Sequence, residues 1–144
     1  MELDYDQMFN LDAEDLAEAG IKEAYDSLLP RLRELVGEPL EMEERLDSDA
    51  PSYAVVVGGK EHIVYGRGVN EEESWGRATV ILFDIVNAQL ASSAYRLYAI
   101  NGGNDLGGMF LTEREAEEAR RSLPNRTDWP YLPVDDGSWY GQFH

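Results

Sequence analysis

The sequence predicts an α+β fold: an antiparallel sheet of about four or five strands, packed with an N-terminal helix, a buried central helix and a short C-terminal helix. Three observations lead to this fold class. Apolar residues recur at helical spacing in two long stretches, 13–36 and 71–90. Short β-branched and aromatic runs lie between and after them, separated by glycine turns. The chain has 144 residues, 43% of them hydrophobic, which suits one core and a single domain over 1–144.

The first helix is predicted to begin after Asp12, which stands at an N-cap position with acidic residues in the following turn. Gly20 and Pro30 weaken the helical pattern, so we expect the first to divide the helix and the second to kink it. Gly37 supplies the stop. The outer face is acidic, with Glu14, Glu18, Glu23 and Asp26.

Three strands are predicted next. The alternation of Leu40 and Met42 with glutamates indicates an edge strand, followed by a loop over 47–51. The runs 53–57 and 62–65 flank Gly58-Gly59, a hairpin turn signal, so the three strands should form an antiparallel meander.

The central helix over 71–90 has the widest apolar arc and is therefore expected to be the most buried. The segments 95–100 and 109–111 predict a second strand pair. Four glycines between positions 102 and 108 join them, but the Lys and Ser/Thr of a phosphate loop are missing, so a hairpin loop is the interpretation. Thr112 and Glu115 form a capping-box pattern that starts a short helix.

The last segment, 124–144, is rich in aromatic residues and proline. Solvated rings in such number would leave a large apolar patch in water, so the tail is expected to pack back on the body.

Composition limits the class of protein. Cysteine is absent, which excludes disulfides, thiolate zinc sites and cysteine nucleophiles and fits a cytoplasmic protein. The first residues after Met1 are acidic, and no apolar run reaches the roughly twenty residues of a membrane span, so neither export nor membrane insertion is predicted.

Charge is the most informative property for function. The formal net charge is −17, and the first fifty residues hold sixteen Asp or Glu against four Lys or Arg. With only two lysines, the chain lacks the clustered bases that phosphate binding requires, so no direct nucleic-acid binding is predicted. The excess of carboxylates either keeps the protein soluble or attracts a basic partner.

No catalytic residue, metal ligand or cofactor is assigned from the sequence. Asp84 interrupts an apolar helix and is expected on its exposed side or in an ion pair, and His62 has no second internal histidine to share a metal. The candidate partner-binding residues combine carboxylates with aromatic anchors. They are Asp47, Asp49, Asp105, Trp129, Asp135, Asp136, Trp139 and Tyr140.

A small, cysteine-free, strongly acidic α+β chain with a glycine-rich hairpin at 102–108 and an aromatic, acidic C-terminus resembles the immunity proteins of bacterial toxin systems. The resemblance implies a stoichiometric inhibitor that occupies the basic cleft of a toxin or nuclease. The alternatives are a non-catalytic adaptor that docks through its first helix, and an enzyme acting through carboxylates such as Asp84 with Glu61 or Asp105. The sequence leaves the oligomeric state open.

Overall fold

The computed structural model describes residues 8–47, 52–66, 74–101 and 105–133. Its strands are β1 (Phe9–Asn10), β2 (Met42–Asp47), β3 (Ser52–Val57), β4 (Lys60–Tyr65), β5 (Tyr95–Ile100) and β6 (Gly107–Thr112). Its helices are α1 (Ala13–Asp15), the π-helical turn η2 (Leu16–Gly20), α2 (Ile21–Val36), α3 (Ser74–Gln89), α4 (Glu113–Ser122) and the 3-10 turn η5 (Arg126–Asp128). The α+β class is confirmed.

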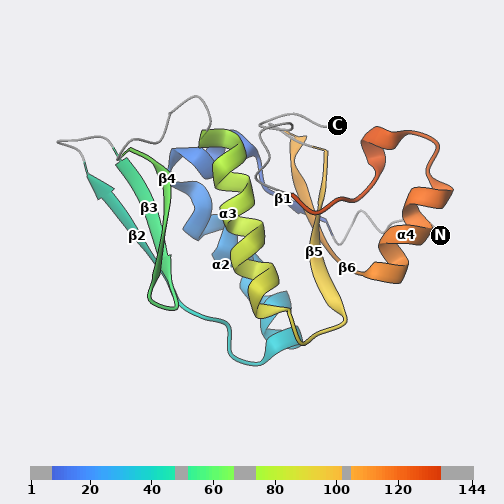
Figure 1. The fold of residues 1–144 in the computed structure, drawn as a ribbon, viewed down its shortest axis with the longest axis horizontal. Helices are drawn as coiled ribbons and strands as arrows, with labels where there is room; N and C mark the ends of the chain where they lie inside the picture. Colours follow the sequence, from blue (N-terminus) through green and yellow to red (C-terminus); the bar gives the residue numbers. More distant parts are fainter. Residues whose placement is uncertain (1–7, 48–51, 67–73, 102–104, 134–144) are drawn as a thin grey trace.

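The strands form two antiparallel sheets of three strands, in the orders β2-β3-β4 and β1-β6-β5. The expectation of one sheet of about four or five strands is therefore wrong. Both hairpins occur as predicted, but α2 and α3 lie between them and keep their edges apart (Figure 1). The second sheet gains its third strand from β1, which pairs Phe9 with Gly108. Nothing in a two-residue strand signals this pairing in the sequence.

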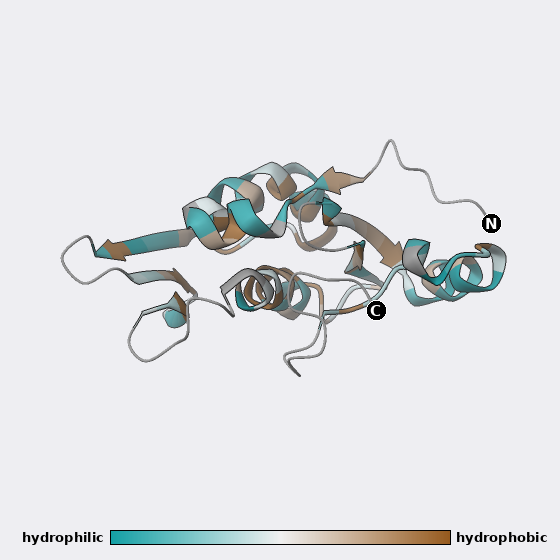
Figure 2. Ribbon diagram, turned by 90° about the horizontal axis from the view of Figure 1, so that it is seen from above, coloured by the Kyte–Doolittle hydropathy of each residue, from teal (hydrophilic) through white to brown (hydrophobic). Residues whose placement is uncertain are grey.

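The helices and sheets share one large core. α3 contacts both β4 and β5, so it lies between the two sheets (Figures 1 and 2). Its residues from Ala78 to Phe83 are all buried, which confirms the central helix as a buried element. The other face of the second sheet forms a smaller cluster with α4, in which Tyr98, Met109 and Leu111 pack against Ala116 and Ala119.

Three element boundaries coincide with local signals that are visible in the sequence. The Asp12 carboxylate accepts a hydrogen bond from the Glu14 N–H, 3.0 Å away, at the start of α1. Thr112 and Glu115 form the predicted capping box at the start of α4. Gly58 and Gly59 turn from β3 to β4 with φ of 59° and 81°, values that glycine adopts without strain.

The N-terminal helix is divided as expected at Gly20, where the π-helical turn η2 passes into α2. Pro30 lies inside α2, which continues to Val36. Among the described residues, no helix is long and apolar enough to cross a membrane.

Candidate protein-binding surface

Of the residues that the sequence singled out, Asp47, Asp105 and Trp129 lie in the described part of the chain. Asp47 is exposed at the end of β2, and Asp105 is exposed just before β6. Trp129 follows η5, which lies at the opposite end of the long axis from β2 (Figure 1). The structure therefore does not bring Asp47 and Trp129 together. The remaining candidates lie outside the described residues: Asp49, Asp135, Asp136, Trp139 and Tyr140.

Trp129 is half-buried and bound to its own chain. Its indole N–H donates to the Leu123 carbonyl at 3.0 Å, and the Arg126 guanidinium lies 5.7 Å from its ring centroid. Tyr131 nearby pairs with Ala99 of β5, and burial raises the pKa of its hydroxyl to about 12. Residues 129–131 thus make contacts within the chain that stabilise the end of its described part.

A different surface gathers carboxylates. The segment α1-η2-α2 buries Leu16, Ile21, Leu28 and Leu32 against the core, and its opposite side faces solvent. A hollow of about 380 Å³ lies on this solvent side. We call it the acidic hollow; it is lined by Asn10, Leu11, Asp15, Glu18, Gly20, Glu23, Ala24 and Ser27.

The backbone break at Gly20 shapes the acidic hollow. A Cβ added to Gly20 would collide with the Asp15 carbonyl oxygen, so the π-helical turn requires glycine at this position. The N–H of Ile21, at the start of α2, donates to the Tyr53 hydroxyl of β3 at 3.1 Å. π-Bulges in helices often coincide with functional sites because they redirect side chains out of the regular helical register. Here Glu18 lies within the turn, and Glu23 lies in the first turn of α2 that follows it.

The carboxylates of the acidic hollow form no ion pair with a base in the part of the chain that the structure describes. Within the described residues, no lysine or arginine forms an ion pair with Asp15, Glu18 or Glu23. Lys22 lies on the same helix, but its ammonium pairs with Asp26 at 2.9 Å. Exposed carboxylates that have no counter-charge create a negative potential over the surface around them.

The base of the acidic hollow contrasts with its rim. Leu11 is buried at 4% exposure, and Ala24 is half-buried, so apolar atoms lie beneath the carboxylates. This combination suits a lysine or arginine side chain, whose methylene stem packs on apolar atoms while its charged head meets carboxylates. The outer-face glutamates were visible in the sequence, but the hollow depends on the π-helical turn.

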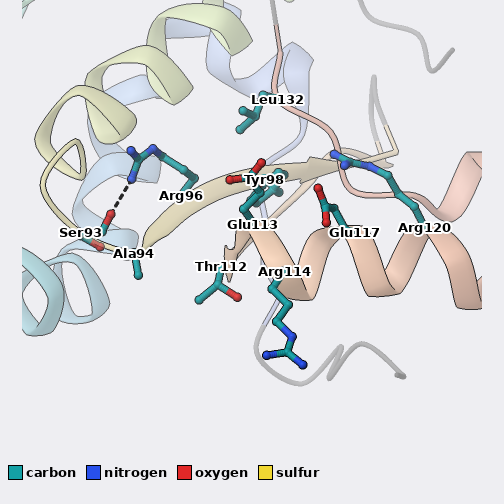
Figure 3. Close-up of a pocket in the computed structure, with 10 residues that line it drawn as sticks. All are labelled: Ser93, Ala94, Arg96, Tyr98, Thr112, Glu113, Arg114, Glu117, Arg120 and Leu132. Carbon is teal, nitrogen blue, oxygen red and sulfur yellow. Dashed lines mark hydrogen bonds between the residues drawn. The ribbon is translucent and has the colours of Figure 1, made fainter.

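A second pocket, of about 890 Å³, lies between β5 and α4 (Figure 3). Two of its arginines, Arg96 and Arg120, donate hydrogen bonds to main-chain carbonyls. Arg96 donates to the Leu90 and Ser93 carbonyls at 2.7 and 2.9 Å and so caps the C-terminal end of α3. Arg120 donates to the Pro130 carbonyl and lies over the Tyr98 ring. Burial raises the pKa of Tyr98. Glu113 and Glu117 face the same pocket, so its charges are mixed.

The residues considered for carboxylate catalysis lie on three separate elements. Asp84 is on the exposed side of α3, as expected, while Glu61 is on β4 and Asp105 precedes β6. None of the three lines either pocket described above. In the described ranges no group of three or more His, Asp or Glu side chains could hold a metal ion.

Comparisons with protein-family models, curated proteins and solved structures found no match to this chain.

Proposed function

We propose that this protein is a protein-binding inhibitor, an immunity protein that neutralises a basic toxin or nuclease, and that the acidic hollow contacts its partner. The single observation that carries the proposal is the arrangement of Asp15, Glu18 and Glu23 around a hollow with an apolar base and no neutralising base among the described residues. This surface lies within the N-terminal part of the sequence, where the charge excess is concentrated.

The physical role of such a surface is attraction followed by anchoring. Uncompensated carboxylates accelerate encounter with a basic partner, and a lysine or arginine of that partner then enters the hollow. Added salt should slow association, because exposed charges are screened over about 8 to 10 Å at ordinary ionic strength. Inhibition follows if the bound protein covers the basic cleft in which the partner holds its phosphate substrate.

The test begins with a pull-down from the source cell at low salt, which identifies the partner. The association rate of the purified pair is then measured for wild type, Glu18→Lys and Glu117→Lys. Both substitutions change the net charge by the same amount, but Glu117 is on α4, far from the hollow. We expect Glu18→Lys to weaken binding about tenfold, mainly through slower association, and Glu117→Lys to have a much smaller effect.

Equal effects of the two substitutions would show that net charge alone matters and would contradict the hollow as the contact. An assay of the partner's own activity separates inhibition from the adaptor alternative, which also uses the first helix. An adaptor would bind with the same dependence on Glu18 but leave that activity unchanged.

A further inference from the structure

β2 is a terminal strand of its sheet. It pairs along its whole length with β3, from Met42 with Val57 to Asp47 with Ser52, and no strand of the described chain pairs with its other side. Figure 1 shows β2 as the outermost strand of this sheet. Such an edge presents a row of main-chain N–H and C=O groups on which another strand can add.

The side chains of this edge include exposed apolar residues. Leu46 is 62% exposed in β2, and Leu40, two residues before the strand begins, is 47% exposed. In the described part of the chain only one other large hydrophobic side chain, Leu132, is classed as exposed. Charged residues alone would suit an edge protected against pairing, whereas exposed leucines in and beside the edge strand favour contact with another chain.

The sequence of β2 is complementary to itself when reversed. Two copies related by a two-fold axis through Glu44, perpendicular to the sheet, place Glu43 opposite the partner's Arg45 and Met42 opposite the partner's Leu46. Each of these pairs occurs twice. Opposite charges and apolar pairs facing each other across antiparallel strands stabilise the ladder.

Registers displaced toward Asp47 fit less well. Side chains alternate between the two faces of the sheet along each strand, and paired residues must lie on the same face. The register can therefore shift only in steps that keep each pair on one face. An axis through Arg45 places Arg45 opposite the partner's Arg45 and Glu43 opposite the partner's Asp47, which repel. An axis through Leu46 pairs Arg45 with the partner's Asp47 but leaves only three residues of β2 in the ladder.

The preferred register has one unfavourable pair, Glu44 opposite the partner's Glu44. The Tyr53 hydroxyl donates to each Glu44 carboxylate at 2.5 Å, which partly offsets the repulsion. Arg45 already pairs with Glu61 at 3.2 Å, but its side chain is 58% exposed and its guanidinium has further N–H groups for a second carboxylate.

We infer that the edge of β2 binds a second copy of this chain, so that two three-stranded sheets form one continuous antiparallel sheet of six strands centred on Glu44. The residues involved are distinct from the acidic hollow, and the inference does not depend on the proposed function. The occupant is a second copy because the strand supplies, in reverse order, the charges and apolar side chains that its own edge requires.

Sedimentation equilibrium of the full chain tests the inference, over concentrations from about 10 µM to about 1 mM, the range expected for a small interface. Wild type should form dimers. Glu43→Arg and Arg45→Glu, each alone, should raise the dimer dissociation constant at least about tenfold, because like charges then face each other twice. Mixed in equal amounts, these two variants should form heterodimers, since both pairs between positions 43 and 45 become opposite in charge. Glu117→Arg and Arg114→Glu on α4 are the matched charge controls and should dimerise like wild type.

A wild-type chain that stays monomeric throughout would overturn the inference, and this is also the result if the edge instead takes a basic segment of another protein. Dimers that survive both single substitutions would overturn it, as would mixed variants that do not associate. Circular dichroism melting of each variant confirms that the fold is intact.

Discussion

The Tyr53 hydroxyl joins the sheet β2-β3-β4 to the break in the N-terminal helix, and its removal is the sharpest test of how that helix is held. The side chain is fully buried. The hydroxyl accepts from the Ile21 N–H at 3.1 Å and donates to the Glu44 carboxylate at 2.5 Å. Burial raises the pKa of Tyr53 far above its ordinary value, so the hydroxyl remains a donor at any physiological pH.

Tyr53→Phe removes one oxygen and leaves the ring in place. The buried Ile21 N–H then loses the acceptor that the Tyr53 hydroxyl provides, at a cost of about 1 kcal/mol. The hydrogen bond to a carboxylate is also lost, but Glu44 is half-exposed and water replaces part of it. The expected loss in free energy of unfolding is therefore about 2–4 kcal/mol.

Urea denaturation of wild type and variant gives this difference directly, and the melting temperature should fall by roughly 5–12 °C for a domain of this size. Tyr65→Phe is the matched control, because the Tyr65 hydroxyl makes no hydrogen bond among the described residues and its ring neighbours Tyr53 with a centroid separation of 6.2 Å. We expect a change below about 0.5 kcal/mol for Tyr65→Phe. If Tyr53→Phe were equally mild, the hydroxyl would not hold the start of α2.

Three further predictions concern other parts of the fold. A Cβ at Gly108 would lie 3.0 Å from Leu11 Cδ1 and 3.2 Å from Leu97 Cδ1. Gly108→Ala should therefore lower the free energy of unfolding, measured by urea denaturation, by about 1–3 kcal/mol. A variant more stable than wild type would contradict the close packing. Thr112→Ala removes the cap of α4 and should cost about 1 kcal/mol, measured in the same way, whereas Thr112→Ser should retain most of the stability. Burial lowers the pKa of His62, so the unfolded chain binds a proton at this residue more readily than the folded chain, and the free energy of unfolding should fall as pH drops below about 6.5. His62→Gln should flatten this part of a profile of stability against pH. An unchanged slope would show that other groups cause the pH dependence.

The sequence predicted the features that depend on a few neighbouring residues. The cap at Asp12, the Gly58-Gly59 turn and the capping box at Thr112 each involve contacts within about four positions, so residue type and spacing suffice to recognise them. The buried central helix followed from apolar periodicity, which reports the face that a helix turns toward the core.

Features that depend on distant segments were not predictable in this way. Pairing between strands is decided by which edges remain free after the helices pack, so the sequence could not show that α3 separates the two hairpins or that Phe9 joins Gly108. The start of α2 likewise contacts a distant segment, because the Ile21 N–H donates to the hydroxyl of Tyr53, thirty-two positions later.

The same division holds for the candidate site. The amino-acid sequence by itself determined that this protein is strongly anionic and that its first fifty residues hold most of the excess charge, because charge follows from composition. Only the tertiary structure decided that Asp15, Glu18 and Glu23 surround one hollow while Asp47 and Trp129 lie at opposite ends of the molecule. The physical reason is that electrostatic potential depends on distances in space, and folding sets those distances.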